Sequence, residues 1–315
     1  MASGPARAEA PDPGPDRARE AGAIQRRDTW RRRVPLLPAL LFTIVITQVP
    51  FLFSIWYSLT DWKIVPPTPR EFTGLENYTS GYSNPFFLDA VGTTLAMTVT
   101  TVLLSVVVGT VLALLLDRDF PGRGVVRTLL ITPFLIMPVV AGLVWKNQMF
   151  SSVFGVFSWL LETLGFQAIP FVERWPLWSI IVVLVWQWSP FMMLIVLAGL
   201  QSQPTDILEA ARVDGASSRG IFAQITLPLL RPYLELGILL GSIYIIQVFD
   251  HVEVITGGGP GSTNVPYFVF QRSIGGGWDF GQASAYAIIV VIASIIIATF
   301  ALRLLSGLLE GHEVA

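Results

Sequence analysis

The stretch "EAARVDGASSRGIFAQITLP", residues 209–228, is a charged, helix-prone insert between two long apolar runs, residues 177–200 and 233–255. It is too polar to be buried in lipid and too long to be a simple turn. Of the 315 residues of the chain, 53% are hydrophobic and only 13% are charged. Soluble domains carry roughly 25% charged residues. The sequence therefore predicts a membrane protein, with this insert at one of its two aqueous faces.

The apolar runs set the number of predicted spans. A helix that crosses a bilayer needs about 20 mostly apolar residues. Six stretches meet or approach this length, residues 35–58, 90–116, 127–149, 177–200, 233–255 and 284–306. An Arg cluster precedes the first run, as in a signal peptide, but no small-residue cleavage site follows it, so we expect a retained span. We predict an all-α polytopic membrane protein with six transmembrane helices.

The distribution of positive charge predicts the orientation, because Lys and Arg favour cytoplasmic loops. With the N-terminus inside, the inner segments hold 15 Lys and Arg residues and the outer segments hold 5. Both termini and the segment 201–232 are then cytoplasmic. Residues 1–33 are rich in Pro, Ala and Arg, which predicts a disordered N-terminal tail. Residues 34–307 form the six-span domain and residues 308–315 a short cytoplasmic tail.

The segment 201–232 predicts two short helices joined by a corner. Pro204 suits a first helical turn, and polar residues beside it can cap free amides. Gly215 can end this helix in the left-handed conformation. Ser217 or Ser218 can cap a second helix, which Pro228 and Pro232 would terminate. By spacing alone, the hairpin is either a loop packed on its own helix ends or a docking element for a cytoplasmic partner.

The order of residues favours docking. The sequence "EAARVDGASSRGIFAQITLPLLRP" resembles the EAA motif of ATP-binding cassette (ABC) importer permeases. The matching positions are Glu209, Ala210, Ala211, Asp214, Gly215, Leu227 and Pro228. The resemblance implies an importer-permease fold whose coupling helix, after Pro204, inserts into a cleft on an ATPase subunit. It also implies that ATP and Mg bind the partner ATPase dimer, that this chain binds no cofactor, and that the chain itself is not an enzyme.

A second stretch, "FDHVEVITGGGPGSTN" at residues 249–264, narrows the resemblance. It is similar to a segment of carbohydrate-importer permeases of the maltose and glycerol-phosphate type. The outer-loop positions that match are Thr256, Gly258, Gly259 and Pro260. The resemblance implies a bacterial plasma (inner) membrane location, a distinct second permease subunit and an extracytoplasmic sugar-binding protein. The Gly run is not followed by Lys, so it does not form a nucleotide-binding P-loop.

Polar residues inside spans indicate functional sites, because they are costly in lipid. In the fifth predicted span, Tyr244, Gln247 and His251 recur on one helix face, with Asp250 one step aside. Amides and aromatic rings suit the hydroxyls and apolar faces of a sugar. We expect Tyr244, Gln247, Asp250 and Trp186 to line a substrate pathway. Gln247 could instead bond a partner helix, and Trp186 could face lipid.

Other function classes remain as alternatives. An ion-coupled secondary transporter or channel would need buried charges, and Lys146 and Asp250 lie near span ends, where snorkelling or a loop contact explains them. A membrane enzyme would need a clustered nucleophile, metal set or carboxylate pair. The chain has no Cys and two His, which disfavours a metal site. We expect a permease of an ATP-driven importer of a sugar, polyol or related carbohydrate, with membrane lipid and no nucleic acid among its partners.

Overall fold

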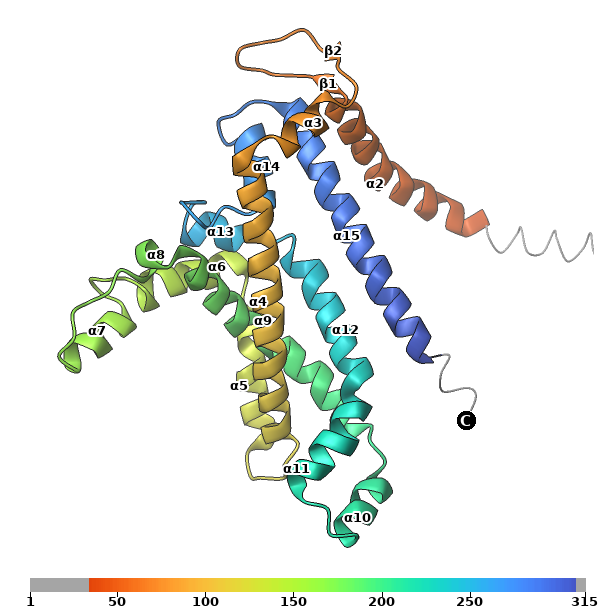
Figure 1. Cartoon of the computed structure of the whole chain (residues 1–315), viewed down its shortest axis with the longest axis vertical. Coiled ribbons are helices and arrows are strands. Elements are labelled where there is room, and N and C mark those ends of the chain that lie inside the picture. The colour runs from red at the N-terminus through yellow and green to blue at the C-terminus, as the bar shows by residue number, and fades with distance from the viewer. Residues whose placement is uncertain (1–33, 310–315) are drawn as a thin grey trace, which may run out of the picture. The chain divides into compact units, whose positions relative to one another are not determined.

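The computed structural model describes residues 34–309, most of which are helical (Figure 1). The chain divides into two units, Met1–Trp56 and Tyr57–Ala315, which are described separately. The predicted N-terminal tail and residues 310–315 of the predicted C-terminal tail lie outside the described residues.

The first unit contains a 3-10 turn, η1 (Val34–Leu36), and almost all of α2 (Leu37–Ser58). Polar side chains of α2 bond to the helix itself. The hydroxyls of Thr43 and Thr47 donate to carbonyls four residues earlier, at 2.9 and 2.7 Å. Internal bonds of this kind allow hydroxyl groups to lie in a bilayer.

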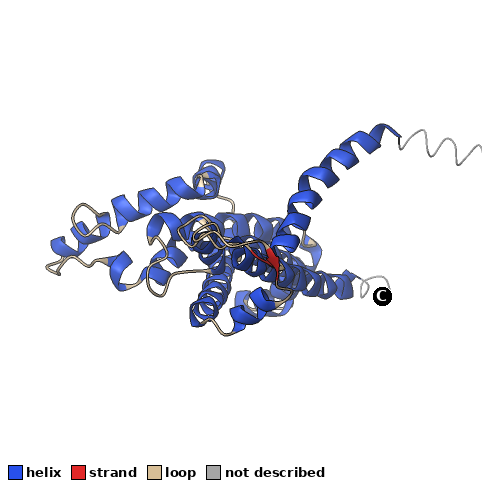
Figure 2. Ribbon diagram, turned by 90° about the horizontal axis from the view of Figure 1, so that it is seen from above, coloured by secondary structure: helices blue, strands red, loops and turns tan. Residues whose placement is uncertain are grey.

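The second unit is a set of helices with one small sheet. Its elements, in chain order, are β1 (Thr60–Asp61), β2 (Glu71–Phe72), α3 (Glu76–Tyr82), α4 (Pro85–Leu116), α5 (Arg123–Leu135), α6 (Pro138–Val144), the π-helical turn η2 (Trp145–Met149), α7 (Val156–Thr163), α8 (Phe171–Arg174), α9 (Pro176–Gln201), α10 (Thr205–Val213), α11 (Ser218–Ile221), the π-helical turn η3 (Phe222–Thr226), α12 (Leu227–Ile245), α13 (Asp250–Ile255), α14 (Val265–Ser273) and α15 (Phe280–Leu309). The strands β1 and β2 pair antiparallel, with Thr60 opposite Phe72 (Figure 2).

Within the described residues, three helices are long and apolar enough to cross a membrane, namely α2, α4 and α9. The pair Arg123–Leu135 and Pro138–Met149 meets the same criteria together, but it is bent by 99°. In α15, the stretch Phe280–Ile296 is apolar but shorter than these three helices. The described chain is mostly helical, as the all-α prediction requires, apart from the short pair β1 and β2, whereas six uninterrupted membrane-spanning helices are not shown.

The third predicted span, residues 127–149, is not one helix. It breaks at Ile136 and Met137, whose ψ angles of 135° and 134° are extended. Pro138 explains the break, because proline disfavours a helical conformation in the residue before it and has no N–H to continue the bonding.

The fifth predicted span, residues 233–255, is also interrupted. The helix α12 ends at Ile245 and α13 begins at Asp250. Between them, the Val248 carbonyl accepts a bond from the Asn264 side chain. A side-chain amide thus replaces a helical N–H at this break. The prediction that Tyr244, Gln247 and His251 share one continuous helix face is therefore wrong.

The helices α4, α9 and α12 pack against one another (Figure 1). Gly109 of α4 lies so close to α9 that an added Cβ would be 2.6 Å from Met192 Cβ and 2.8 Å from the Met193 backbone nitrogen. Gly237 and Gly241 of α12 face Met192 from the other side, where an added Cβ would be 3.0 Å from its Sδ and 2.6 Å from its Cε. Gly237 and Gly241, which have a Gly-x-x-x-Gly spacing, thus pack closely on a neighbouring helix, as is typical of small residues at helix interfaces in membranes.

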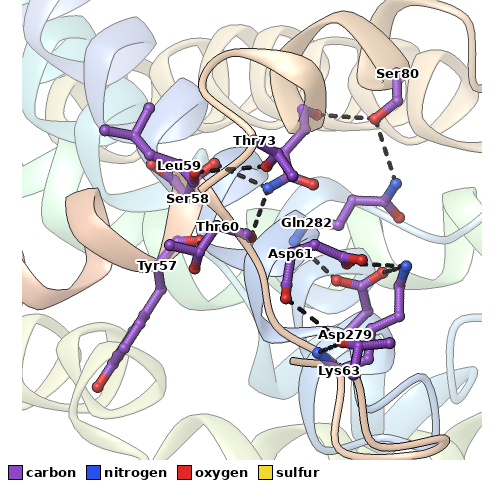
Figure 3. Close-up of polar contacts among 12 residues, drawn as sticks. Tyr57, Ser58, Leu59, Thr60, Asp61, Lys63, Thr73, Ser80, Asp279 and Gln282 are labelled. Carbon is purple, nitrogen blue, oxygen red and sulfur yellow. Dashed lines mark hydrogen bonds and ion pairs between the residues drawn. The ribbon is translucent and has the colours of Figure 1, made fainter. Parts of the chain in front are cut away.

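Ion pairs and hydrogen bonds join the segment around β1 to the start of α15. Lys63 lies between Asp61, at 3.0 Å, and Asp279, at 3.9 Å (Figure 3). The hydrogen bond that Lys63 donates to the Asp61 carboxylate is the main cause that raises the Lys63 pKa. Asn77 donates to the carbonyls of Ser58 and Thr60, both at 3.0 Å. These bonds hold the residues that follow α2 against the rest of the second unit.

The close approach at Gly109 predicts a specific sensitivity. Gly109→Val should lower the stability of the protein by about 1–3 kcal/mol, because backbone atoms of α9 cannot move aside as a flexible side chain would. The measurement is the thermal unfolding midpoint of the purified protein in detergent. Gly92→Val is the control, since Gly92 lies on the same helix with no atom within 4 Å of an added Cβ. Equal midpoints for the two variants would contradict this account of the packing.

Candidate functional site

The insert 201–232 folds as the predicted helix, corner and helix. Gly215 has φ of +80° and follows α10. Its N–H bonds to the Arg212 carbonyl at 3.1 Å, and the Ala216 N–H bonds to the Ala211 carbonyl at 3.0 Å. This pair of bonds is the Schellman motif, which needs the left-handed conformation that Gly adopts without strain. The side chain of Ser217 then accepts from the Gly220 N–H and caps α11.

Two details of this hairpin differ from prediction. No side chain caps the start of α10, where Pro204 occupies the cap position. Pro228 and Pro232 do not end the second helix, because the π-helical turn η3 carries it into α12 without a gap. Pro228 lies in the first turn of α12, where a missing N–H is tolerated, and Pro232 lies inside the helix.

The hairpin presents most of the predicted coupling residues to its surroundings. The exposed ones are Glu209, Ala210, Asp214, Gly215, Leu227 and Pro228, and Ala211 is half-buried. Its base is fixed to the helices. Gln203 donates from its amide to the Thr226 carbonyl at 3.2 Å, and the Ser202 and Tyr233 hydroxyls are 2.8 Å apart. The exposed apolar side chains Ile207 and Val213 accompany the charges on α10, so this surface can bind another protein through both kinds of contact.

A cavity of about 360 Å³ lies between the two helix breaks. The residues that line it are Phe134, Ile136, Pro138, Gln187, Trp188, Tyr244, Gln247, Val248, Phe249, Asp250 and His251. The breaks thus bring together segments more than 100 residues apart in the sequence. Aromatic rings, two amides and a carboxylate share this space, a combination that can bind hydroxyl groups and apolar faces of a small polar molecule.

The structure places three of the four predicted pathway residues in this cavity. Tyr244 is 59% exposed and its ring lies 5.4 Å from that of Trp188. Gln247 donates to the Ile243 carbonyl at 3.0 Å, so its amide is bonded within its own segment. Asp250 begins α13 at the cavity edge.

Trp186 lies elsewhere. Its ring centroid is 5.5 Å from that of Trp145, and its side chain lines a separate apolar pocket beside Val182 and Pro190. The neighbouring Trp188 lines the polar cavity instead. The different locations of Trp186 and Trp188 do not follow from the sequence alone. Each helix position points about 100° away from the one before it, and the sequence does not indicate which face of α9 lies toward the cavity.

Gln187 and His251 are buried polar residues beside this cavity, at 4% and 3% exposure. Gln187 Nε2 lies 2.6 Å from the Ile136 carbonyl oxygen, and its Oε1 lies 2.7 Å from His251 Nε2. The sequence does indicate that the Ile136 carbonyl lacks a helical partner, because Pro133 and Pro138 together predict a helix break in the third apolar run.

The predicted outer-loop motif forms a closely bonded turn after α13. The Thr256 hydroxyl donates to the Val252 carbonyl and accepts from Ser262, both at 3.0 Å. Gly258 has φ of +63°, and an added Cβ would be 2.0 Å from the Tyr267 ring. Gly259 accepts from the Ser262 hydroxyl at 2.8 Å. Pro260 lies beyond these bonds and borders a larger groove. These positions shape the turn.

Lys146, near the first break, has a structural partner. It donates to the carbonyl of Val254, in α13, at 2.9 Å. Among residues 34–309, no group of three or more His, Cys, Asp or Glu side chains could hold a metal ion.

Comparison with known proteins gives the family. The model of the family described as "Binding-protein-dependent transport system inner membrane component" matches residues 105–308. A probable ABC transporter permease protein, y4oQ of Sinorhizobium fredii, is 37% identical and the match covers 92% of this chain and 96% of the relative. The trehalose/maltose transport system permease protein MalF of Thermococcus litoralis is 34% identical, with 83% and 90% covered.

A solved structure has a similar fold. It is a bacterial ABC transporter involved in the import of the acidic polysaccharide alginate, with a TM-score of 0.77, 21% identity, and 91% of this chain and 98% of the other covered. The exposed EAA hairpin, the helical architecture and these matches agree. The chain belongs to the family of inner membrane components of binding-protein-dependent transport systems, the permease subunits of ABC transporters.

Proposed function

We propose that this permease imports a sugar, polyol or related carbohydrate through the cavity between the two helix breaks. The cavity is the observation that carries the proposal, because the rings of Trp188 and Tyr244 adjoin the polar groups of Gln247 and Asp250. Such a lining suits the apolar faces and hydroxyls of a saccharide. The similarity to a trehalose/maltose permease supports the same substrate class.

The proposed topology has six spans with both termini in the cytoplasm. The bent pair of α5 and α6 would form one interrupted span, and α12 with α13 another, which together with α2, α4, α9 and α15 makes six. Interrupted helices are tolerated in membranes where they line a cavity. The excess of Lys and Arg in the inner segments supports the orientation.

The hairpin of α10 and α11 would dock on a separate ATPase. The exposed Glu209 and the Gly215 corner would form the coupling surface, and ATP with Mg would bind the ATPase dimer. A second, distinct permease subunit and an extracytoplasmic sugar-binding protein would complete the importer. Substrate would reach the inside by alternating access, with ATP-driven closure of the ATPase dimer moving the helices through the hairpin.

The corner at Gly215 predicts a coupling defect. In Gly215→Val, the left-handed conformation would cost about 1–2 kcal/mol, which shifts the population of this corner by about five- to thirtyfold. We expect ATP-dependent uptake of trehalose or maltose to fall at least fivefold, while the permease still inserts and copurifies with its partner permease. The measurement is uptake by the full complex in proteoliposomes.

The matched control for this variant is Gly122→Val. Gly122 has φ of +82° in the turn before α5 and, like Gly215, has no atom within 4 Å of an added Cβ. The same backbone strain there should leave coupling unchanged. Equal uptake by the two variants would overturn the coupling role of the corner.

The cavity predicts a substrate effect at Gln247. Gln247→Ala should raise the sugar concentration for half-maximal uptake by about two- to thirteenfold, as expected for one lost hydrogen bond of about 0.5–1.5 kcal/mol. The amount of ATPase that copurifies should not change. Gln148→Ala, at an exposed amide in η2 away from the cavity, is the control. If Gln247→Ala leaves the half-saturating concentrations of trehalose and maltose unchanged, the sugar path lies elsewhere. Transport that is driven by an ion gradient and needs no ATPase would favour the secondary-transporter alternative.

A further inference from the structure

One side chain of the uninterrupted helix α9 bonds to the segments at both helix breaks beside the cavity. Gln187 lies in the middle of α9 and reaches the Ile136 carbonyl of the first break at 2.6 Å. It also reaches His251, in the first turn after the second break, at 2.7 Å. Its partners are 51 and 64 residues away in the sequence.

The direction of these bonds can be assigned. The Ile136 carbonyl only accepts, so the Gln187 amide nitrogen must face it. The amide oxygen therefore faces His251 and accepts, which requires a proton on His251 Nε2. Gln187 thus uses a donor toward one break and an acceptor toward the other, so no residue without both groups can replace it.

The two short helices that follow the breaks are also attached to each other. Gly142 of α6 is so close to α13 that an added Cβ would be 3.0 Å from Val254 Cγ1. Lys146, just after α6, donates to the Val254 carbonyl at 2.9 Å. The helices α6 and α13 therefore form a packed pair, and the Gln187 bridge lies where this pair begins.

We propose that Gln187 is a positioning residue for transport, which sets the separation of the two cavity walls by bridging Ile136 and His251. The inference rests on the proposed sugar pathway. Ile136 and Pro138 line one wall, and Tyr244 and Gln247 line the other. Because unsatisfied polar groups are costly inside a bilayer, the bridge favours the one wall separation that satisfies both bonds.

The length of the Gln side chain provides the first test. Gln187→Asn keeps the amide but is one methylene shorter, so it cannot reach both partners. We expect the half-saturating trehalose concentration for uptake by the full complex in proteoliposomes to rise at least fivefold, with the maximal rate within twofold of wild type. Gln148→Asn, the same change at an exposed position in η2, should behave as wild type.

Changes at His251 test the same bridge from the other side. His251→Phe removes the donor and should match the Gln187→Asn effect. His251→Gln restores an N–H at a similar reach and should return half-saturation to within twofold of wild type. The double variant Gln187→Asn/His251→Phe should be no worse than the more affected single variant, because both changes break one unit.

A direct measurement of wall separation does not depend on transport. The chain has no Cys, so Met137→Cys beside the first wall and Tyr244→Cys on the second, both exposed positions, can carry a unique pair of spin labels. Electron paramagnetic resonance of the complex should give a narrow distance distribution with Gln187 and a clearly broader one with Asn at that position.

Each result decides the question. A wild-type complex that transports no sugar or polyol, trehalose and maltose included, would contradict the proposed function, and the spin-label experiment would still test the bridge. Altered half-saturation with unchanged label distances would make Gln187 a direct sugar ligand and overturn the proposal. Unchanged half-saturation would overturn it too, as would failure of both single variants to assemble, since the bridge would then be a folding contact.

Discussion

Backbone polar groups inside a bilayer need partners within the protein, and the described part of this permease is organised around that constraint. Regular helices such as α4 and α9 meet it by themselves. At the two breaks the chain leaves carbonyls without a helical partner, at Ile136 and at Val248. Amide side chains of Gln187 and Asn264 supply the missing donors. The interruptions that create the cavity are therefore stable because of residues distant in sequence.

Features that depend on local chemistry could be predicted from the sequence. The length and apolarity of α4 and α9 follow from a count of residues, and the corner at Gly215 follows from the rarity of left-handed conformations in other residues. The Ser217 cap follows from the preference of Ser for that position. For each of these, a few neighbouring residues determine the outcome, so no knowledge of tertiary contacts was required.

The second break could not be predicted in the same way, because hydropathy measures only whether a segment is apolar. Residues 233–255 are apolar enough for a span, yet the helix stops where Asn264 bonds Val248. The spacing of Tyr244 and His251 predicts that they share one face of a helix, but the helix does not continue between them. Tyr244, Gln247 and Asp250 nevertheless line the cavity as predicted from their polarity. A polar side chain is costly in lipid whether or not the helix that carries it continues.

A continuous helical path connects the two candidate sites, the hairpin of α10 and α11 and the cavity beside the second break. From Ser218 the chain is helical through α11, η3 and α12 to Ile245, with no gap between the hairpin and the second break. Pro232 lies within this path without ending it. In the proposed mechanism, a displacement of the hairpin would be carried along this continuous helix to Tyr244 at the cavity wall. The same path would be useless for coupling if the helix broke at the prolines, since a flexible joint there would absorb the motion before it reached the cavity.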